Sequence, residues 1–425
     1  MRTQLSLILA AAALAFTAPL AAQTPEEVAA AALKNSAVWD GHNDVPEQVR
    51  ARYLDVLKDF DFNDTSHAAK SPYRDNNAGM HTDLPRLRQG KVGAQFWSVY
   101  VDADQPEADI AVQTVEQIDL VKRLVAKYPN DLLLATSSAD VEAAWKQGKV
   151  ASLMGMEGGG SIDGSLAVLR QLYALGARYM TLTHSKTLAW ADSATDDPKH
   201  DGLTDFGRDV VREMQRIGML VDLSHVSEGT MNDALDVAQA PVIFSHSGAR
   251  AVNGHARNVP DSVLTRLAAN GGIVMVVALP DYVSQKVLVW DSLHNAEEAR
   301  LKALWRGQPD AVKRELAAWD KANPVPKATV SDMADHIDHI KQVAGIDHIG
   351  LGGDYDGMDS GPVGMEDVRG YPALFSELAK RGYSQADLEK IASRNMLRVL
   401  KAAEAYAAAH RADLPIEYPV KPAAL

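Results

Sequence analysis

The chain has 425 residues, of which 46% are hydrophobic, so it can bury a large core, and this composition excludes intrinsic disorder. Its formal net charge of −13 at pH 7 argues against binding to nucleic acid. It contains no cysteine, which excludes disulfides and thiolate metal sites. Any transition metal must therefore be bound by His, Asp or Glu side chains.

Residues 1–22 have the pattern of a secretory signal peptide. Arg2 precedes an apolar run at residues 5–16, and small residues follow up to Ala22. This run is too short to span a bilayer comfortably, although an uncleaved anchor is the alternative. The C-terminal residues carry no second apolar run that would indicate a tail or lipid anchor. We therefore expect an exported product, periplasmic or secreted, with no membrane anchor after cleavage.

Short apolar runs alternate with amphipathic segments through the rest of the chain, as is typical of parallel strands joined by helical crossovers. Eight strands are predicted, at residues 37–45, 93–101, 150–158, 177–185, 219–226, 241–247, 272–279 and 348–357. The clearest helices between them lie at residues 107–128, 165–175, 205–217, 228–238, 261–269 and 331–343. Eight β/α repeats predict an α/β fold of the closed (β/α)8 TIM-barrel type, in a single domain at residues 23–425.

Three segments lie outside this simple repeat. Residues 55–88 are polar, with Ser-Pro and Asn-Asn pairs, which indicates a long loop over one face of the barrel. Residues 291–327 are rich in helix-forming residues and predict a helical insertion between strands 7 and 8. A last helical region, at residues 384–408, follows the barrel.

Ionisable residues mark the ends of six of the predicted strands. They are His42 and Asp44 on strand 1, Glu157 on strand 3, His184 on strand 4, His225 on strand 5, His246 on strand 6 and Asp354 on strand 8. The carboxyl ends of barrel strands open on one face, so we expect these side chains to meet in one site. An ionisable group at the end of a buried strand costs free energy unless it is paired or metal-bound. Imidazoles and carboxylates without sulfur suit two Zn²⁺ ions bridged by a carboxylate.

Any one of these residues, taken singly, is more often structural than metal-binding, and only their joint position favours a site. Three other histidines are interpreted as structural. His336 and His339 lie three residues apart on the helix before strand 8, in the outer ring. His81 lies near the start of a helix that Thr82 or Asp83 would cap, with a weaker claim to support the site.

Arg257 follows strand 6 in a loop that leads into a helix, and we expect it to lean over the site. Its forked guanidinium would bind a substrate that carries a carboxylate, and a surface salt bridge is the alternative. Asp192 is a weaker candidate for the site than Arg257.

These motifs resemble the membrane dipeptidase family, also called the renal dipeptidase family or peptidase family M19, a branch of the metal-dependent amidohydrolase superfamily. The similar segments are WDGHNDVP, GMEGG, YMTLTHS, VDLSHVS, PVIFSHSGAR, residues 257–260 and GLGGDYDG. They run in order through residues 38–399, which is nearly the whole mature chain. The resemblance implies the barrel that the strand pattern also predicts.

The resemblance further implies a metallo-dipeptidase with two Zn²⁺ ions per chain. Two residues would bind each ion and Glu157 would bridge both: His42 and Asp44 for one ion, His225 and His246 for the other. A metal-bridging hydroxide would attack the peptide bond. Small dipeptides are the expected substrates, and family precedent extends to a C-terminal D-residue and to some β-lactams. A homodimer is left open.

Three further residues receive roles from the resemblance. His184 and Arg257 would contact the substrate, His184 at the developing oxyanion and Arg257 at the C-terminal carboxylate. Asp354 would take a proton near the bridging oxygen and pass it to the leaving amine.

Some residues depart from the family pattern. Gly160 stands where the mammalian form has His, and Leu279 and Pro280 stand where relatives have an aromatic residue near the substrate. The insertion at residues 291–327 is expected to lie over the site. Without cysteines or a lipid-anchor signal, the covalent dimer and membrane tether of mammalian members do not transfer. Two alternatives to the dipeptidase remain: another amidohydrolase, acting on N-acyl amino acids or on cyclic amides such as β-lactams, or a noncatalytic metal- or peptide-binding protein.

Overall fold

The predicted eight-stranded parallel barrel is present in the computed structural model, which describes residues 23–66, 71–73 and 79–419. Its strands are β1 (Val38–Asn43), β2 (Val92–Tyr100), β4 (Val150–Glu157), β5 (Ala177–Thr181), β6 (Leu220–Asp222), β7 (Ile243–Ser247), β8 (Ile273–Val276) and β9 (Ile349–Leu351). They pair in the order β2-β1-β9-β8-β7-β6-β5-β4, and pairing of β2 with β4 closes the ring. The predicted signal peptide lies outside the described residues.

A ninth strand, β3 (Leu132–Leu134), was not predicted. It pairs with residues 150–152 of β4, whereas β5 pairs with residues 154–157 of the same strand. Because β2 occupies the other edge of β4 along its whole length, β3 and β5 share one edge. The short β3 therefore extends the sheet at the N-terminal end of the barrel without breaking the ring.

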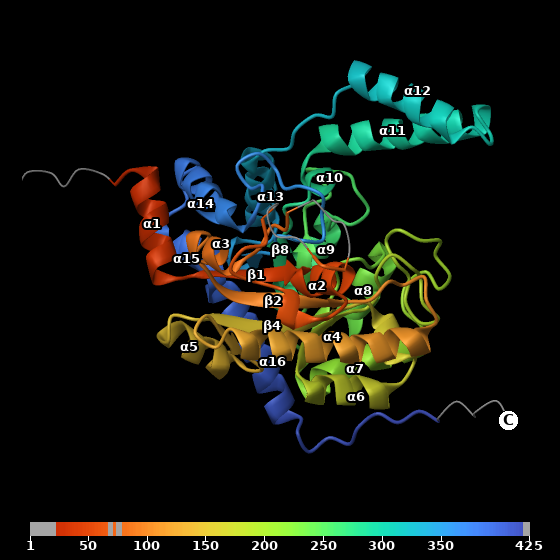
Figure 1. Cartoon of the computed structure of the whole chain (residues 1–425). Helices are drawn as coiled ribbons and strands as arrows, with labels where there is room; N and C mark the ends of the chain where they lie inside the picture. Colours follow the sequence, from red (N-terminus) through yellow and green to blue (C-terminus); the bar gives the residue numbers. More distant parts are fainter. Residues whose placement is uncertain (1–22, 67–70, 74–78, 420–425) are drawn as a thin grey trace, which may run out of the picture.

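Helices form the outer layer around the strands (Figure 1). The predicted ones are α4 (Glu107–Lys127), α6 (Leu166–Leu175), α7 (Asp205–Ile217), α8 (Glu228–Val237), α9 (Asp261–Asn270) and α13 (Val330–Val343). Others flank them: α1 (Pro25–Asn35), α2 (Val45–Tyr53), α5 (Ser138–Lys146) and α14 (Tyr371–Lys380). The predicted C-terminal helical region consists of α15 (Gln385–Glu389), a π-helical turn (Lys390–Arg394) and α16 (Asn395–Ala409).

Large side chains fill the interior of the barrel. Trp39, Phe96 and Tyr179 are fully buried in one hydrophobic cluster, and Met396 and Leu400 of α16 belong to the same cluster. The C-terminal helix therefore packs against one end of the barrel. The opposite end, where the strands terminate, remains available for a site.

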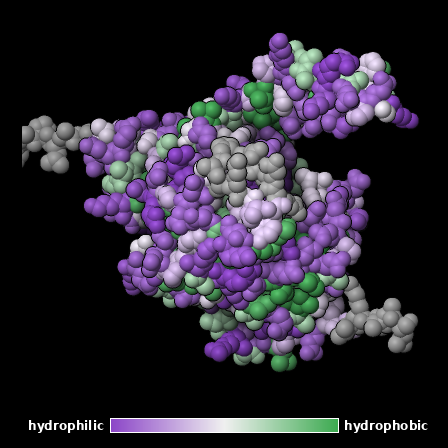
Figure 2. All heavy atoms as spheres, in the orientation of Figure 1, coloured by the Kyte–Doolittle hydropathy of each residue, from purple (hydrophilic) through white to green (hydrophobic). Residues whose placement is uncertain are grey.

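The predicted insertion is a helical hairpin, here called the arm, formed by α11 (Gln285–Leu304) and α12 (Pro309–Ala322). It follows a short helix, α10 (Pro280–Val283), and begins six residues earlier than predicted. The arm projects away from the barrel (Figure 1), and its visible face is mostly hydrophilic (Figure 2). Most of its length therefore does not lie over the strand ends, and only its base approaches them.

The predicted loop at residues 55–88 lies partly outside the described residues. Its described part contains a 3-10 turn, η1 (Leu57–Asp59), and the start of a helix, α3 (Leu84–Gln89). None of the helices in the described ranges combines the length and the apolar character needed to cross a membrane.

Candidate metal centre and active site

The other four predicted metal ligands lie around Glu157, the last residue of β4. Its Oε1 lies 2.9 Å from Nε2 of His225 and 3.4 Å from Nε2 of His246, and its Oε2 lies 3.3 Å from Nε2 of His42. Asp44 Oδ2 lies 3.4 Å from His42 Nε2, and the Nε2 atoms of His225 and His246 are 2.9 Å apart. The carboxylate thus lies between two pairs of candidate ligands, as a bridging ligand would.

Hydrogen bonds on the far side of two imidazole rings orient them toward this centre. His42 Nδ1 lies 2.8 Å from the Tyr179 hydroxyl, which itself donates to a main-chain carbonyl. His246 Nδ1 lies 2.8 Å from Ser245 Oγ, which donates to Asp222. Both hydroxyls must therefore accept a hydrogen bond from Nδ1–H, and in the neutral ring this leaves a lone pair on each Nε2. This is the arrangement of metal-binding histidines.

A glycine makes room for one of these contacts. A Cβ atom at Gly155 would collide with the ring of Tyr179. The GMEGG segment of β4 therefore helps to place the Tyr179 hydroxyl beside His42, besides carrying Glu157.

The donor atoms fit a pair of divalent transition-metal ions. His42 Nε2 and Asp44 Oδ2 are buried and have no hydrogen-bond partner in the described part of the chain. Three sets have ligand atoms within 4.8 Å of one another: His42 with Glu157 and His246, Glu157 with His184 and His225, and His42 with Asp44 and Asp354. Imidazole nitrogens and carboxylate oxygens without sulfur suit zinc among other metals. A cation would satisfy the orphaned buried atoms.

The electrostatics also favour a cation. Burial alone would raise the pKa of Glu157, but the surrounding imidazoles, above all His42, bring it well below its usual value. Burial lowers the pKa of His225 and His246 far below normal, so both rings are neutral near pH 7. Burial also acts on His42, but Glu157, the Tyr179 hydroxyl and Asp44 raise its pKa well above normal. A proton and a metal ion would therefore compete for His42 Nε2.

Two site residues adopt left-handed backbone conformations that are unusual for non-glycine residues. His225 has φ 69° and Asp354 has φ 62°. Each lies three residues beyond the end of its strand, β6 or β9. The main-chain N–H of Asp354 donates to the carbonyl oxygen of His42 at 3.2 Å, which holds the turn against β1. Local strain of this kind is common where a side chain must be aimed into a site.

His184 and Asp354 lie beside the candidate ligands. The ring of His184 stacks between Tyr100 and His225, at centroid distances of 4.8 and 4.2 Å. Its Nε2 is 3.8 Å from Glu157, and its Nδ1 has no hydrogen-bond partner in the described ranges. Burial lowers the pKa of His184, so the ring is neutral, and burial raises the pKa of Asp354 well above normal. Both groups can therefore carry and donate a proton.

Arg257 is a buried cation, only 1% exposed, without an ion pair in the described part of the chain. Its guanidinium makes two long hydrogen bonds of 3.4 Å, to Ser247 Oγ and to the carbonyl oxygen of His246, and its Nε has none. A buried charge without a counter-ion is costly unless a ligand supplies one. The surface salt bridge considered from the sequence is not formed, and an anionic ligand group fits this position.

Tyr282 is an aromatic site residue that the sequence analysis did not identify. Leu279 and Pro280 stand where relatives have an aromatic residue near the substrate. The structure supplies one two residues further on, because Tyr282 of α10 lies on the site with the Arg257 guanidinium 5.3 Å from its ring centroid.

The site opens into a cavity of about 280 Å³. Its wall contains most of the predicted site residues: Asp44, Glu157, His184, His225, His246, Arg257 and Asp354. Sequence reasoning missed three others, Glu47, Tyr100 and Tyr282. Burial and the carboxylates of Asp44 and Glu157 raise the pKa of Glu47 to about 8. Glu47 follows Asp44 by one helical turn, which was the available signal.

The weaker candidates lie elsewhere. His336 Nδ1 accepts the N–H of Ala249 and its Nε2 contacts the carbonyl oxygen of Val283, while His339 contacts Asp261 at 2.7 Å on α9. Both contacts agree with the structural interpretation of these histidines.

The remaining polar candidates stabilise loops or a helix end. His81 Nδ1 accepts the N–H of Asp356, and Asp83 caps α3 as predicted. The carboxylate of Asp192 accepts main-chain N–H groups of residues 199, 200 and 202, which fixes the loop between them. Burial would raise the pKa of Asp192, but these hydrogen bonds lower it. Gly160 lies in the turn η2 (Gly159–Ile162), where an added Cβ would stand 3.2 Å from Ile110.

Known proteins are similar to this chain in sequence and in fold. A dipeptidase named tcpJ from Claviceps purpurea is 42% identical over 386 residues, which cover 89% of this chain and 79% of the relative. The crystal structure of the probable dipeptidase PvdM from Pseudomonas aeruginosa superposes with a TM-score of 0.74 at 22% identity, covering 90% of this chain and 99% of that one.

A metallopeptidase from Rhodobacter sphaeroides, liganded with a phosphinate mimic of the dipeptide L-Ala-D-Ala, has a TM-score of 0.68 at 21% identity, covering 87% of this chain and 99% of that one. At this level of identity, both structures establish the shared fold. The family model for membrane dipeptidases, peptidase family M19, matches residues 26–413, nearly the whole described chain. The chain therefore belongs to the membrane dipeptidase family, peptidase family M19.

Proposed function

We propose that this protein is a zinc-dependent dipeptidase that hydrolyses the single peptide bond of small dipeptides, including those with a C-terminal D-residue. The observation that carries the proposal is the position of Arg257. A buried guanidinium without a counter-ion lies on the same cavity as the candidate metal ligands. A dipeptide places its C-terminal carboxylate close to its scissile carbonyl, so it can reach both groups.

The metal assignment is the one that the family resemblance implies, and the short distances within each pair of donors support it. One Zn²⁺ would be held by His42 and Asp44, the other by His225 and His246, and Glu157 would contribute one oxygen to each pair. When bound, these ions supply Lewis-acid polarisation of the peptide carbonyl and activation of the hydrolytic water.

The protein residues orient the substrate and move protons. Arg257 binds the C-terminal carboxylate through its unused N–H groups, which fixes the position of the peptide bond. His184 donates a hydrogen bond to the carbonyl oxygen as negative charge develops on it. Asp354 takes a proton from the attacking water and transfers it to the departing amine nitrogen. The raised pKa of Asp354 supports this shuttle, because the group holds a proton readily.

The test is hydrolysis of a dipeptide panel by chelated and reconstituted protein. The panel pairs L,L and L,D dipeptides with their C-terminal amides, with N-acyl amino acids and with a cyclic amide. We expect free dipeptides to be cleaved only after zinc is restored, with amides cleaved poorly. Preferred cleavage of N-acyl amino acids or cyclic amides would favour another amidohydrolase. Absence of cleavage in the zinc-loaded protein would favour the noncatalytic alternative, a metal- or peptide-binding protein.

A further inference from the structure

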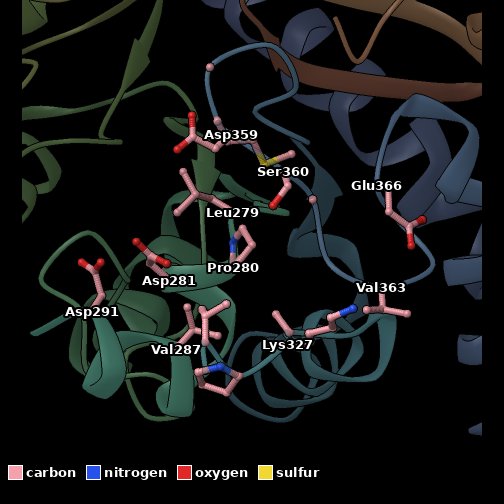
Figure 3. Close-up of a pocket in the computed structure, with 16 residues that line it drawn as sticks. Leu279, Pro280, Asp281, Val287, Asp291, Lys327, Asp359, Ser360, Val363 and Glu366 are labelled. Atoms are coloured by element: carbon pink, nitrogen blue, oxygen red, sulfur yellow. The ribbon is translucent and has the colours of Figure 1, made fainter. Parts of the chain in front are cut away.

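A second cavity, here called the outer cavity, adjoins the metal-site cavity. It measures about 690 Å³ and lies between the base of the arm and the loop that follows β9 (Figure 3). Leu279 and Gly357 line both cavities. The two cavities are therefore adjacent, with Leu279 and Gly357 at their common boundary.

Gly357, at the boundary of the two cavities, lies beside two carboxylates of the metal site. An added Cβ at Gly357 would stand 2.8 Å from Asp354 Oδ1 and would collide with Asp44 Oδ2, so a glycine is needed beside these carboxylates. Arg257, in contrast, contacts Ser247 and the main chain of His246, on the β7 side of the site. A dipeptide with its C-terminal carboxylate on Arg257 could direct its N-terminal residue toward Gly357, because both residues line the metal-site cavity.

The lining of the outer cavity is strongly acidic. It contains Asp281, Asp291, Asp359 and Glu366, with Lys327 as the single cation among the lining residues. In Figure 3, Asp281, Asp291 and Asp359 lie on the side of Leu279, and Glu366 and Val363 lie on the other. The pKa of Asp281 is raised first by burial and then by the negative charges of Asp291 and Asp359. The three carboxylates therefore repel one another.

Two of these carboxylates are unused by the protein. The side chains of Asp281 and Asp359 form no hydrogen bond or ion pair within the described part of the chain. Asp281 is only partly exposed, so its charge is incompletely solvated. A cationic group bound between Asp281 and Asp359 would relieve their mutual repulsion and be attracted to both carboxylates. Because Asp359 is exposed, salt would screen part of this attraction.

We propose that the outer cavity is the subsite for the side chain of the N-terminal residue, and that it selects a cationic side chain such as that of lysine or arginine. Its position next to the metal-site cavity makes it a subsite, and the charge of its wall sets the chemical class. This inference rests on the dipeptidase function proposed above and adds a substrate class to it.

The test compares two substrates, Lys-Gly and norleucyl-glycine, which differ only in the terminal ammonium group of the N-terminal side chain. Zinc-loaded full-length protein should cleave Lys-Gly with a kcat/KM about tenfold higher at low ionic strength, and the ratio should shrink as salt is added. The double variant Asp281→Asn with Asp359→Asn should bring the ratio close to one. Because both substrates use the same metal site, a folding defect would lower both rates and leave the ratio intact.

Two further variants sharpen the comparison. Asp310→Asn removes an exposed carboxylate on α12 that does not line the cavity, and it should keep the wild-type ratio. Asp281→Lys should reverse the preference between N-terminal Lys and Glu. A wild-type ratio near one, or a ratio that survives the double variant, would overturn the subsite while leaving the dipeptidase standing. Failure to cleave either peptide would overturn both proposals.

Discussion

At the residue scale, the metal site depends on groups that do not themselves face the metal. The Tyr179 hydroxyl fixes the proton of His42 on Nδ1, and Ser245 does the same for His246. The orientation of each ring is therefore set before any cation binds. The loss of such a contact should weaken metal binding without removing a ligand.

Tyr179→Phe tests this dependence. The variant loses the hydrogen bond to His42 but keeps the buried ring, so zinc affinity should fall about 10- to 100-fold. Competition with a chromophoric chelator measures that affinity. Tyr128→Phe is the matched control, because its hydroxyl binds the N–H of Phe62 away from the site. If Tyr179→Phe bound zinc as tightly as the control, the proposed role of Tyr179 would be wrong.

Arg257→Met tests the carboxylate anchor. The change removes the charge but keeps a long side chain, so kcat/KM for a free dipeptide should fall by roughly 30- to 150-fold, about 2–3 kcal/mol of charge-assisted binding. The rate for the C-terminal amide should change little. Arg212→Met is the control, since Arg212 is a largely exposed residue of α7 that pairs with Asp209 away from the site. Equal losses for acid and amide would argue against an anchor.

The sequence predicted the candidate metal ligands but not all of the residues that line the site. The metal candidates could be found because an ionisable residue after a buried strand stands out against apolar neighbours. Glu47 and Tyr282 could not be found in this way, because each lies among polar and apolar residues, and Tyr100 could not, because a tyrosine does not stand out in an apolar strand. The burial of Arg257 was equally hidden, since it depends on how residues far apart in the chain pack around one loop.

At the element scale, most strands are shorter than predicted, and strained turns follow two of them. The pairing of β6 ends at Asp222 and that of β9 at Leu351, three residues before His225 and Asp354. A hydrophobic pattern locates the strand but not the point where pairing stops. The three-residue β3 carries too little pattern to be recognised, and it forms because β4 offers it a free edge.

His336 links two elements that carry site residues. Its ring on α13 accepts the N–H of Ala249, in the loop leading to Arg257, and contacts the carbonyl oxygen of Val283, next to Tyr282. Burial lowers the pKa of His336 from 6.5 to about 4. The histidine that the sequence marked as structural therefore holds the α10 and β7–α9 segments together in its neutral form.

This linkage predicts a pH-dependent stability. Below pH 6.5 the unfolded chain takes up a proton at His336, whereas the folded chain does so only near pH 4. The free energy of unfolding should therefore lose up to about 3 kcal/mol from this residue as the pH falls from 6.5 to 4. In urea unfolding experiments, His336→Gln should show a correspondingly smaller loss. A variant with the full wild-type pH dependence would contradict the assignment.

At the scale of the whole molecule, the barrel brings together residues more than 300 positions apart, from His42 to Asp354. The alternation of strands and helices predicted this closure. It did not predict the direction of the arm, which depends on the packing at its base and not on helix propensity. The projection of the arm leaves the outer cavity beside the site.

Because the candidate ligands come from β1, β4, β7 and the loop after β6, metal binding should stabilise the entire barrel. Zinc at 1,000 times its dissociation constant would add about 4 kcal/mol to the free energy of unfolding. Differential scanning calorimetry should show a lower thermal midpoint after chelation and recovery with zinc. Glu157→Gln should recover far less. An unchanged midpoint on chelation would argue against a metal centre built from these segments.

The most direct test is anomalous diffraction at the zinc edge from crystals of the zinc-loaded protein. Two peaks should flank the Glu157 carboxylate, one within bonding distance of His42 and Asp44 and the other within bonding distance of His225 and His246. No peak beside Glu157, or zinc bound only elsewhere in the molecule, would contradict the proposed centre.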